Sequence, residues 1–328
     1  CHFRESCMSH AVSSSAHFLY AKLCGSSCFS FSGSCFCICL DGWPGKRLPV
    51  YYLFMEDKQM KSILFTCRHN LKLYGKLQIM NIRSITQYRA DFFLMLCFTL
   101  FSQLCSLSVI GIIYTNIPQI AGWTLWETLL LYSFLLFSEG SVNFFFQGSW
   151  KIAEMINLAD LDRFLIRPLP VGLQLLTARI DFDGLNKMFL ATALFLLSQE
   201  HCNICRTPGT LLLLLFFLAE ACMIRTCMIW IASCASFWIE GSKNSLNFLV
   251  ISLGELAKYP LSIYPFPLRA LFGYLIPYAF VSFYPVGYLL GKPGMTPGLW
   301  LTPVICLIFF FLSRVALHAG LKRYESAT

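Results

Sequence analysis

The sequence predicts an all-α, polytopic membrane protein with about six transmembrane helices and an N-terminal interfacial helix. Of its 328 residues, 57% are hydrophobic and 13% charged, and the mean hydropathy is +0.63. Soluble domains carry about 25% charged residues. Apolar runs long enough to cross a bilayer recur along the chain. The basic residues stand at the ends of these runs and form no single cluster, so we expect no nucleic-acid partner despite the formal charge of +8.

Residues 1–59 form an atypical N-terminal extension. They are rich in serine and cysteine and show no sustained helical period. One interpretation is a signal or lipid-anchor segment that begins at Cys1. The other, which we favour, is a mis-called start or a disordered segment ahead of Met55 or Met60, because the usual charged–apolar–small order of a targeting segment is missing. The later cysteines lie mostly inside apolar runs, where they behave as small hydrophobic residues.

The regular part of the sequence, residues 60–328, opens with a basic amphipathic stretch at 61–91. Its pattern predicts a helix on the membrane surface. A first span follows at about 92–114, and a turn at 116–122 contains neither lysine nor arginine. Trp123 and Trp126 mark a membrane interface, and a second span runs from about 125 to 146.

The later spans are less uniform. We predict a third span at about 185–197, a fourth at 210–238 and a last one at 299–317. Between the last two, the apolar run 246–256 is too short to cross a bilayer, and the run 268–290 contains prolines. Whether 246–262 spans the membrane or is re-entrant stays open, because a broken helix is tolerated only where protein or a cavity satisfies its backbone.

The distribution of basic residues predicts the orientation of the chain. They precede the first span, occur in the 150–183 segment and recur at 322–323. The turn after the first span contains no basic residue, and the turn after the third contains only Arg206. Loops rich in lysine and arginine face the cytosol. We therefore predict a multi-pass protein of the cytoplasmic (inner) membrane with both termini in the cytosol.

A charged stretch at 150–170 separates the second and third spans. Apolar residues such as Ile152 and Met155 recur there at helical spacing, with Lys151 and Glu154 on the other side. Prolines 168 and 170 end the helix. It is either a surface helix that only connects two spans or a docking helix for a cytosolic protein.

The run Asp162-Arg163-Phe164-Leu165-Ile166-Arg167-Pro168-Leu169-Pro170 resembles the signature loop of the ABC-2-type transporter permeases. It is most similar to their six-span branch, whose cytosolic loop has a leucine-aspartate pair followed by leucine-arginine-proline. One departure is Ala159, where the family often has glycine. The resemblance covers about residue 60 to the end, and its other matches are Tyr88–Phe92, Tyr259-Pro260, Ile276-Pro277, Tyr284-Pro285 and Leu321–Ser326.

The resemblance implies the transmembrane permease subunit of an ABC-type exporter. Such a subunit uses ATP hydrolysed by a separate cytosolic ABC ATPase, pairs with a second permease copy or a paralogue, and is embedded in membrane lipid. The substrate does not follow from the sequence. The residues that would dock the ATPase are Asp160, Asp162, Arg163, Arg167 and Pro168.

The sequence contains no recognisable catalytic or metal site. It lacks the G-x-x-x-x-G-K-[ST] phosphate loop, so we expect a membrane subunit without its own ATPase site, no enzyme and no cofactor. Cys202 and Cys205 form one C-x-x-C pair next to His201, but no second ligand pair accompanies them. We therefore predict no metal site.

We single out three charges inside predicted spans: Glu139 in the second, and Glu220 and Arg225 in the fourth. Charges within a bilayer are costly and often mark a pathway, so these residues are a possible translocation path. They can instead form structural pairs, although the offset of five between Glu220 and Arg225 is poor for a bridge on one helix. The alternative function is an ATPase-independent secondary transporter or channel driven by Glu139.

Overall fold

The structure, a computed structural model, describes residues 29–31, 34–36, 70–82, 89–158, 160–167, 169–202, 204, 207–239 and 244–324. The chain divides into two units, Cys1–Phe65 and Thr66–Thr328. In the first unit, β1 (Phe29–Phe31) pairs antiparallel with β2 (Ser34–Phe36). Most of the predicted N-terminal extension lies outside the described residues.

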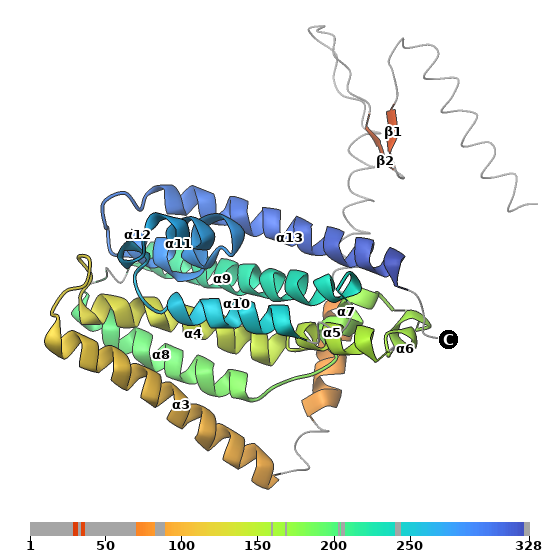
Figure 1. The fold of residues 1–328 in the computed structure, drawn as a ribbon, viewed down its shortest axis with the longest axis horizontal. Coiled ribbons are helices and arrows are strands. Elements are labelled where there is room, and N and C mark those ends of the chain that lie inside the picture. Colours follow the sequence, from red (N-terminus) through yellow and green to blue (C-terminus); the bar gives the residue numbers. More distant parts are fainter. Residues whose placement is uncertain are drawn as a thin grey trace, which may run out of the picture. The chain divides into compact units, whose positions relative to one another are not determined.

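The second unit is a bundle of helices, which confirms the predicted all-α membrane class (Figure 1). The chain enters α4 (Leu125–Phe145) through Thr124, whose N–H donates to the Glu127 carboxylate at 2.8 Å, and this satisfies a donor that a helix start leaves unpaired. At the start of α9 (Pro208–Cys234) the Thr207 hydroxyl accepts from the Thr210 N–H at 3.2 Å. The longest helices are α3 (Arg89–Asn116), α4 (Leu125–Phe145), α8 (Asp183–His201), α9 (Pro208–Cys234) and α13 (Pro297–Arg323).

Among the described residues, α3, α4, α9 and α13 are long and apolar enough to cross a membrane. A bent pair, Phe266–Leu275 and Ala279–Leu289, adds a fifth span if it is counted as one, and its halves meet at 79°. The predicted third span is helical as α8 but carries several charges. The run at 246–256 is α10 (Ser245–Leu256), whose 12 residues are too few to cross alone.

The bent pair explains the proline pattern of the last third. It consists of α11 (Phe266–Ala270), η3 (Leu271–Leu275), η4 (Ala279–Phe283) and α12 (Tyr284–Leu289), and Pro277 lies in the break. Proline lacks the N–H that would continue the first half. After α10 the chain makes the short turn η2 (Leu261–Ile263) and then enters this pair.

Close backbone packing joins α4 to α8, which run side by side (Figure 1). Gly140 and Gly184 face each other, and a Cβ on Gly140 would lie only 2.6 Å from the Gly184 carbonyl oxygen. Small residues let two membrane helices approach in this way. Fully buried side chains of α4 and α9 fill the adjacent core, among them Leu130, Leu131, Phe134, Phe217 and Ile224.

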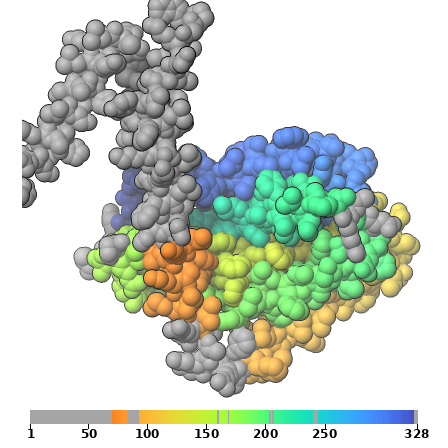
Figure 2. Space-filling model, turned by 180° about the vertical axis from the view of Figure 1, so that it is seen from behind, coloured from red at the N-terminus to blue at the C-terminus, as the bar shows by residue number. Residues whose placement is uncertain are grey.

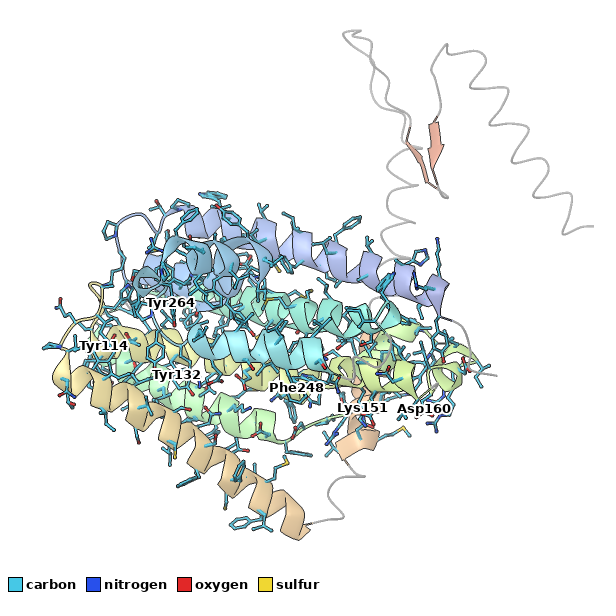
Figure 3. The ribbon with its side chains drawn as sticks, viewed as in Figure 1. Tyr114, Tyr132, Lys151, Asp160, Phe248 and Tyr264 are labelled. Atoms are coloured by element: carbon cyan, nitrogen blue, oxygen red, sulfur yellow. The ribbon has the colours of Figure 1, made fainter. Side chains whose placement is uncertain are left out.

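Three short helices form a block at one end of the bundle. They are α5 (Gly148–Asn157), α6 (Asp162–Leu165) and α7 (Val171–Leu176). The block shares a second buried core with the ends of α9 and α13, where Ile152 and Leu175 pack with Trp230 and Leu317. In Figure 3, Lys151 and Asp160 lie at this end, whereas Tyr114 and Tyr264 lie at the opposite one.

The amphipathic segment before the first span is helical over 70–82 and packs against the same end of the bundle (Figure 2). The Tyr74 hydroxyl donates to the Phe145 carbonyl, and the Asn81 amide donates to the Thr177 carbonyl, each at 2.6 Å. The last turn of α13 is also at this end (Figure 1). Three basic segments, widely separated in sequence, are therefore neighbours in space.

Candidate functional site

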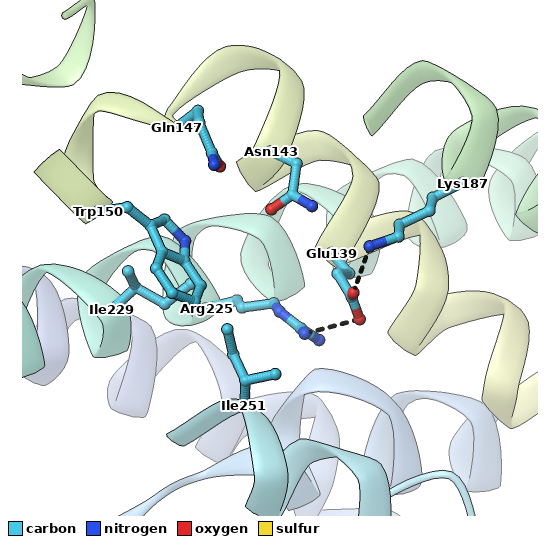
Figure 4. A pocket seen from close by; sticks show the side chains of 8 residues that line it. All are labelled: Glu139, Asn143, Gln147, Trp150, Lys187, Arg225, Ile229 and Ile251. Carbon is cyan, nitrogen blue, oxygen red and sulfur yellow. Dashed lines mark hydrogen bonds and ion pairs between the residues drawn. The ribbon is translucent and has the colours of Figure 1, made fainter. Parts of the chain in front are cut away.

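A cluster of charged side chains joins α4, α8 and α9 (Figure 4). The Glu139 carboxylate of α4 lies 2.8 Å from the Lys187 ammonium of α8 and 2.9 Å from the Arg225 guanidinium of α9. Lys187 also pairs with Asp183, one turn earlier on α8, at 2.8 Å. Through these ion pairs, Glu139 connects α4 to both α8 and α9.

Arg225 is the most deeply placed member of this cluster, since its side chain is 2% exposed. A buried charge is tolerated only when it is paired and hydrogen-bonded. Besides Glu139, Arg225 contacts the Leu135 carbonyl at 3.4 Å and faces the Tyr278 ring at 5.5 Å. The Tyr278 hydroxyl in turn donates to the Val250 carbonyl of α10 at 3.0 Å. Arg225 thus links α4 to α10 and to the bent pair.

A cavity of about 220 Å³ lies beside this cluster. Several of its polar atoms are buried and have no hydrogen-bond partner in the described part of the chain: Trp150 Nε1, Arg225 Nε and Gln147 Oε1. The Trp150 ring also packs against the Phe248 ring of α10 at an interplanar angle of 77°, with centroids 5.9 Å apart. The lining residues are Glu139, Asn143, Gln147, Trp150, Lys187, Arg225, Ile229 and Ile251.

Of the three charges singled out in the sequence, the structure brings Glu139 and Arg225 together and leaves Glu220 apart. Glu220 is 7% exposed, and its Oε2 atom is buried without a partner among the described residues. It lies near Cys306 of α13 and is not part of the cavity lining. Sequence reasoning missed Lys187, for which the available signal was the spacing of four from Asp183.

The predicted docking residues lie on the α5–α7 block. Asp160 and Arg163 form an ion pair at 2.6 Å, with side chains 41% and 68% exposed. The Arg167 guanidinium lies 5.6 Å from the centre of the Phe164 ring. The fifth predicted docking residue, Pro168, lies outside the described residues.

The shape of the block is fixed from inside, while its outer face is exposed. The Gln174 amide donates to the carbonyls of Phe164 and Leu169, at 3.1 and 2.9 Å, across the bend that carries Arg167. Burial, followed by the nearby carboxylates of Asp162 and Asp160, raises the pKa of Tyr324, so the end of α13 lies against this block. On the outer face, Ile166 is 83% exposed.

The first cysteine of the C-x-x-C motif, Cys202, lies at the opposite end of the bundle. Cys202 caps the end of α8, and burial, followed by the charge of Glu127, raises the pKa of its thiol to about 11. Cys205 lies outside the described residues. Across the residues that the structure describes, no three histidine, cysteine or acidic side chains are placed to hold a metal ion.

Apolar helices of membrane-spanning length, broken helices and a buried charge cluster beside a polar cavity define an integral membrane protein of the transport class. The family of ABC-2 family transporter proteins matches residues 100–328. The match covers more than half of the chain, which therefore belongs to this family and is a permease component of an ABC transporter. Family membership implies association with an ABC ATPase subunit. No curated protein and no solved structure matches the chain significantly.

Proposed function

We propose that the chain is the permease subunit of an ABC exporter of the cytoplasmic membrane and that the α5–α7 block docks its ATPase. The proposal rests on one observation: the α5–α7 block buries its inner face against the bundle and exposes its outer face. An exposed apolar side chain such as Ile166, next to Arg163 and Arg167, is typical of a protein-binding surface. Asp160, Asp162 and Pro168 complete the proposed docking set.

The way in which the block is anchored supports a mechanical role. Ile152 of α5 and Leu175 of α7 are fully buried against the ends of α9 and α13. A Cβ at Gly148 would lie 2.7 Å from the Leu176 carbonyl, so α5 has no room to slide against α7. Packed elements of this kind move as a unit. A force that the ATPase exerts on the block would therefore reach two membrane-spanning helices.

The proposed orientation places this end of the bundle in the cytosol. The 70–82 helix, the α5–α7 block and the last turn of α13 all lie at this end (Figure 1), and each carries lysine or arginine. Concentration of basic residues on one side favours the cytosol for that side. Both chain termini then face the compartment in which ATP is available.

A second copy of the chain, or a paralogue, completes the proposed transporter. Membrane lipid surrounds the rest of it, since α3 exposes large apolar residues such as Phe93, Phe98 and Phe101 along its length. Glu139 and Arg225 are proposed to line the path on the cytosolic side, and Glu220 a separate part of it. ATP binding would bias two arrangements of the helices that differ little in free energy.

The proposal is tested by purifying the tagged chain from membranes of its native host. We expect a protein with an ATP-binding signature to accompany it and to hydrolyse ATP. Arg163→Glu and Arg167→Glu reverse exposed charges on the block and should remove this partner. Lys72→Glu reverses an exposed charge on the 70–82 helix and should retain it.

Two outcomes would overturn the proposal. One is a stable, active complex that contains no ATP-hydrolysing subunit and transports under a proton gradient alone, as expected of a secondary transporter driven by Glu139. The other is a tag inserted next to Ile166 that is accessible only from outside the cell.

A further inference from the structure

The cavity beside Glu139 contains polar groups that the protein itself does not satisfy. The indole N–H of Trp150 and the Nε–H of Arg225 are donors without an acceptor among the described residues. A buried polar group without a partner costs about 1–3 kcal/mol. Such groups are rare in folded proteins unless water or a ligand completes them. The cavity is therefore built to hold something that accepts hydrogen bonds.

The charges around the cavity balance one another, so its hydrogen-bond donors decide which kind of occupant it favours. Two cations, Lys187 and Arg225, and one carboxylate, Glu139, are in its lining. The carboxylate is already shared between both cations. Asp183 is paired with Lys187 but does not line the cavity. With Asp183 counted, the two cations and two carboxylates sum to zero, so the preference for an anionic acceptor over a cation rests on the unpartnered N–H groups of Trp150 and Arg225 among the described residues.

The volume limits the size of the occupant. About 220 Å³ is far more than a single water molecule needs. It is less than the roughly 300–1,000 Å³ of a pocket that encloses a whole drug-sized molecule. The cavity fits a small anion or the charged end of a longer molecule.

We propose that this cavity binds an oxyanion group, a carboxylate or a phosphate, that accepts hydrogen bonds from Trp150 Nε1 and Arg225 Nε. Charge-assisted hydrogen bonds of this kind are about twice as strong as neutral ones. The Gln147 amide completes the set, since it can present either a donor or an acceptor to the ligand. The inference deepens the proposed function, on which it rests, by assigning an acidic end group to the transported substrate.

The shared chemistry has two possible sources, the headgroup of an anionic lipid and a soluble acid. The experiment uses the purified full chain in detergent and in lipid nanodiscs. Thermal unfolding is followed during titration with sodium acetate and sodium phosphate, against sodium chloride at equal ionic strength. In parallel, native mass spectrometry measures retention of phosphatidylglycerol relative to phosphatidylcholine. Either probe can report an occupied cavity, and the two arms distinguish the sources.

Two matched pairs of variants connect binding to the cavity. Gln147→Glu adds a negative charge to the lining and should weaken oxyanion binding at least tenfold. Gln103→Glu makes the same change on α3, outside the cavity, and should leave binding unchanged. Trp150→Phe removes one donor but keeps a ring and should weaken binding about tenfold. Trp300→Phe changes a 76% exposed tryptophan on α13 and serves as its control.

Saturable stabilisation by acetate or phosphate, or preferential retention of phosphatidylglycerol, supports the proposal if Gln147→Glu loses the effect and Gln103→Glu keeps it. The proposal is overturned if no probe exceeds its chloride or phosphatidylcholine reference, because water alone then fills the cavity. Equal behaviour of the two Gln→Glu variants overturns it as well. Binding is measured without an ATPase, so the docking proposal and the oxyanion proposal fail separately.

Discussion

Glu139→Gln is the sharpest test of the charge cluster, because it removes one charge and keeps the size of the side chain. The variant leaves the guanidinium of Arg225, whose side chain is 2% exposed, without a charged partner. Lys187 retains Asp183 at 2.8 Å. Removing one partner of a buried ion pair destabilises a protein by about 3–5 kcal/mol. The matched control is Glu154→Gln on α5, whose ion pair with Lys151 has side chains 46% and 30% exposed and should contribute about 0–1 kcal/mol.

Thermal unfolding of the purified protein in detergent measures the difference. A change of 1 kcal/mol shifts the melting temperature by about 2–4 °C for a domain of this size. Glu139→Gln should therefore melt about 6–20 °C lower than the unmodified chain, and Glu154→Gln at most about 4 °C lower. In the double variant Glu139→Gln/Arg225→Met, part of the loss should return, because no unpaired charge remains buried. A Glu139→Gln protein that melts together with Glu154→Gln would refute the reasoning.

Three further predictions concern other parts of the chain. Gly184→Ala should lower the free energy of unfolding by about 1–3 kcal/mol or more, since its Cβ would meet the α4 backbone at 2.5 Å. Gly209→Ala, which has open space around it, should lower it less, and unfolding measurements on both variants check this. In a variant whose sole cysteine is Cys202, maleimide labelling should be slow at pH 8 and should accelerate about tenfold per pH unit up to about pH 11, because only the thiolate reacts. Fast labelling at pH 8 would contradict the raised pKa. Burial, ahead of the charge of Asp183, raises the pKa of Asp181. The contribution of Asp181 to stability is therefore present at low pH and is lost as the pH rises through its folded-state pKa. Asp181→Asn should stabilise the protein at pH 7, and a comparison of unfolding across pH should show that this gain vanishes below about pH 4.

The long spans follow closely from the sequence. The second span, predicted at about 125–146, is α4 (Leu125–Phe145). Its bounds are readable because Trp123 and Trp126 mark one interface and the polar Gln147 follows the other end. The fourth span, predicted at 210–238, corresponds to α9 and the short turn after it, and its start is marked by the Thr207-Pro208 pair.

The charge cluster could not be derived in the same way. Its pairs form between helices, and Glu139 and Arg225 are 86 residues apart in the chain. Which residues meet depends on the rotation of each helix about its own axis, which uniform apolar runs such as α9 do not reveal. The spacing does explain why Glu220 and Arg225 separate. Five residues correspond to about 140° around a helix, so the two side chains leave α9 in different directions.

The two proposals meet on α5. Trp150, in its first turn, lines the cavity, while Ile152 and Met155 fix the same helix to the core shared with α9 and α13. A helix of ten residues is about 15 Å long and stiff over that length. A displacement of the docking block would therefore carry the Trp150 donor together with the packed end of α9, relative to the parts of the lining that belong to α4, α8 and α10. If an ATPase moves the block, the affinity of the cavity for an oxyanion has to change in the same step, because Trp150 belongs to the moving element and Glu139, Lys187 and Ile251 do not.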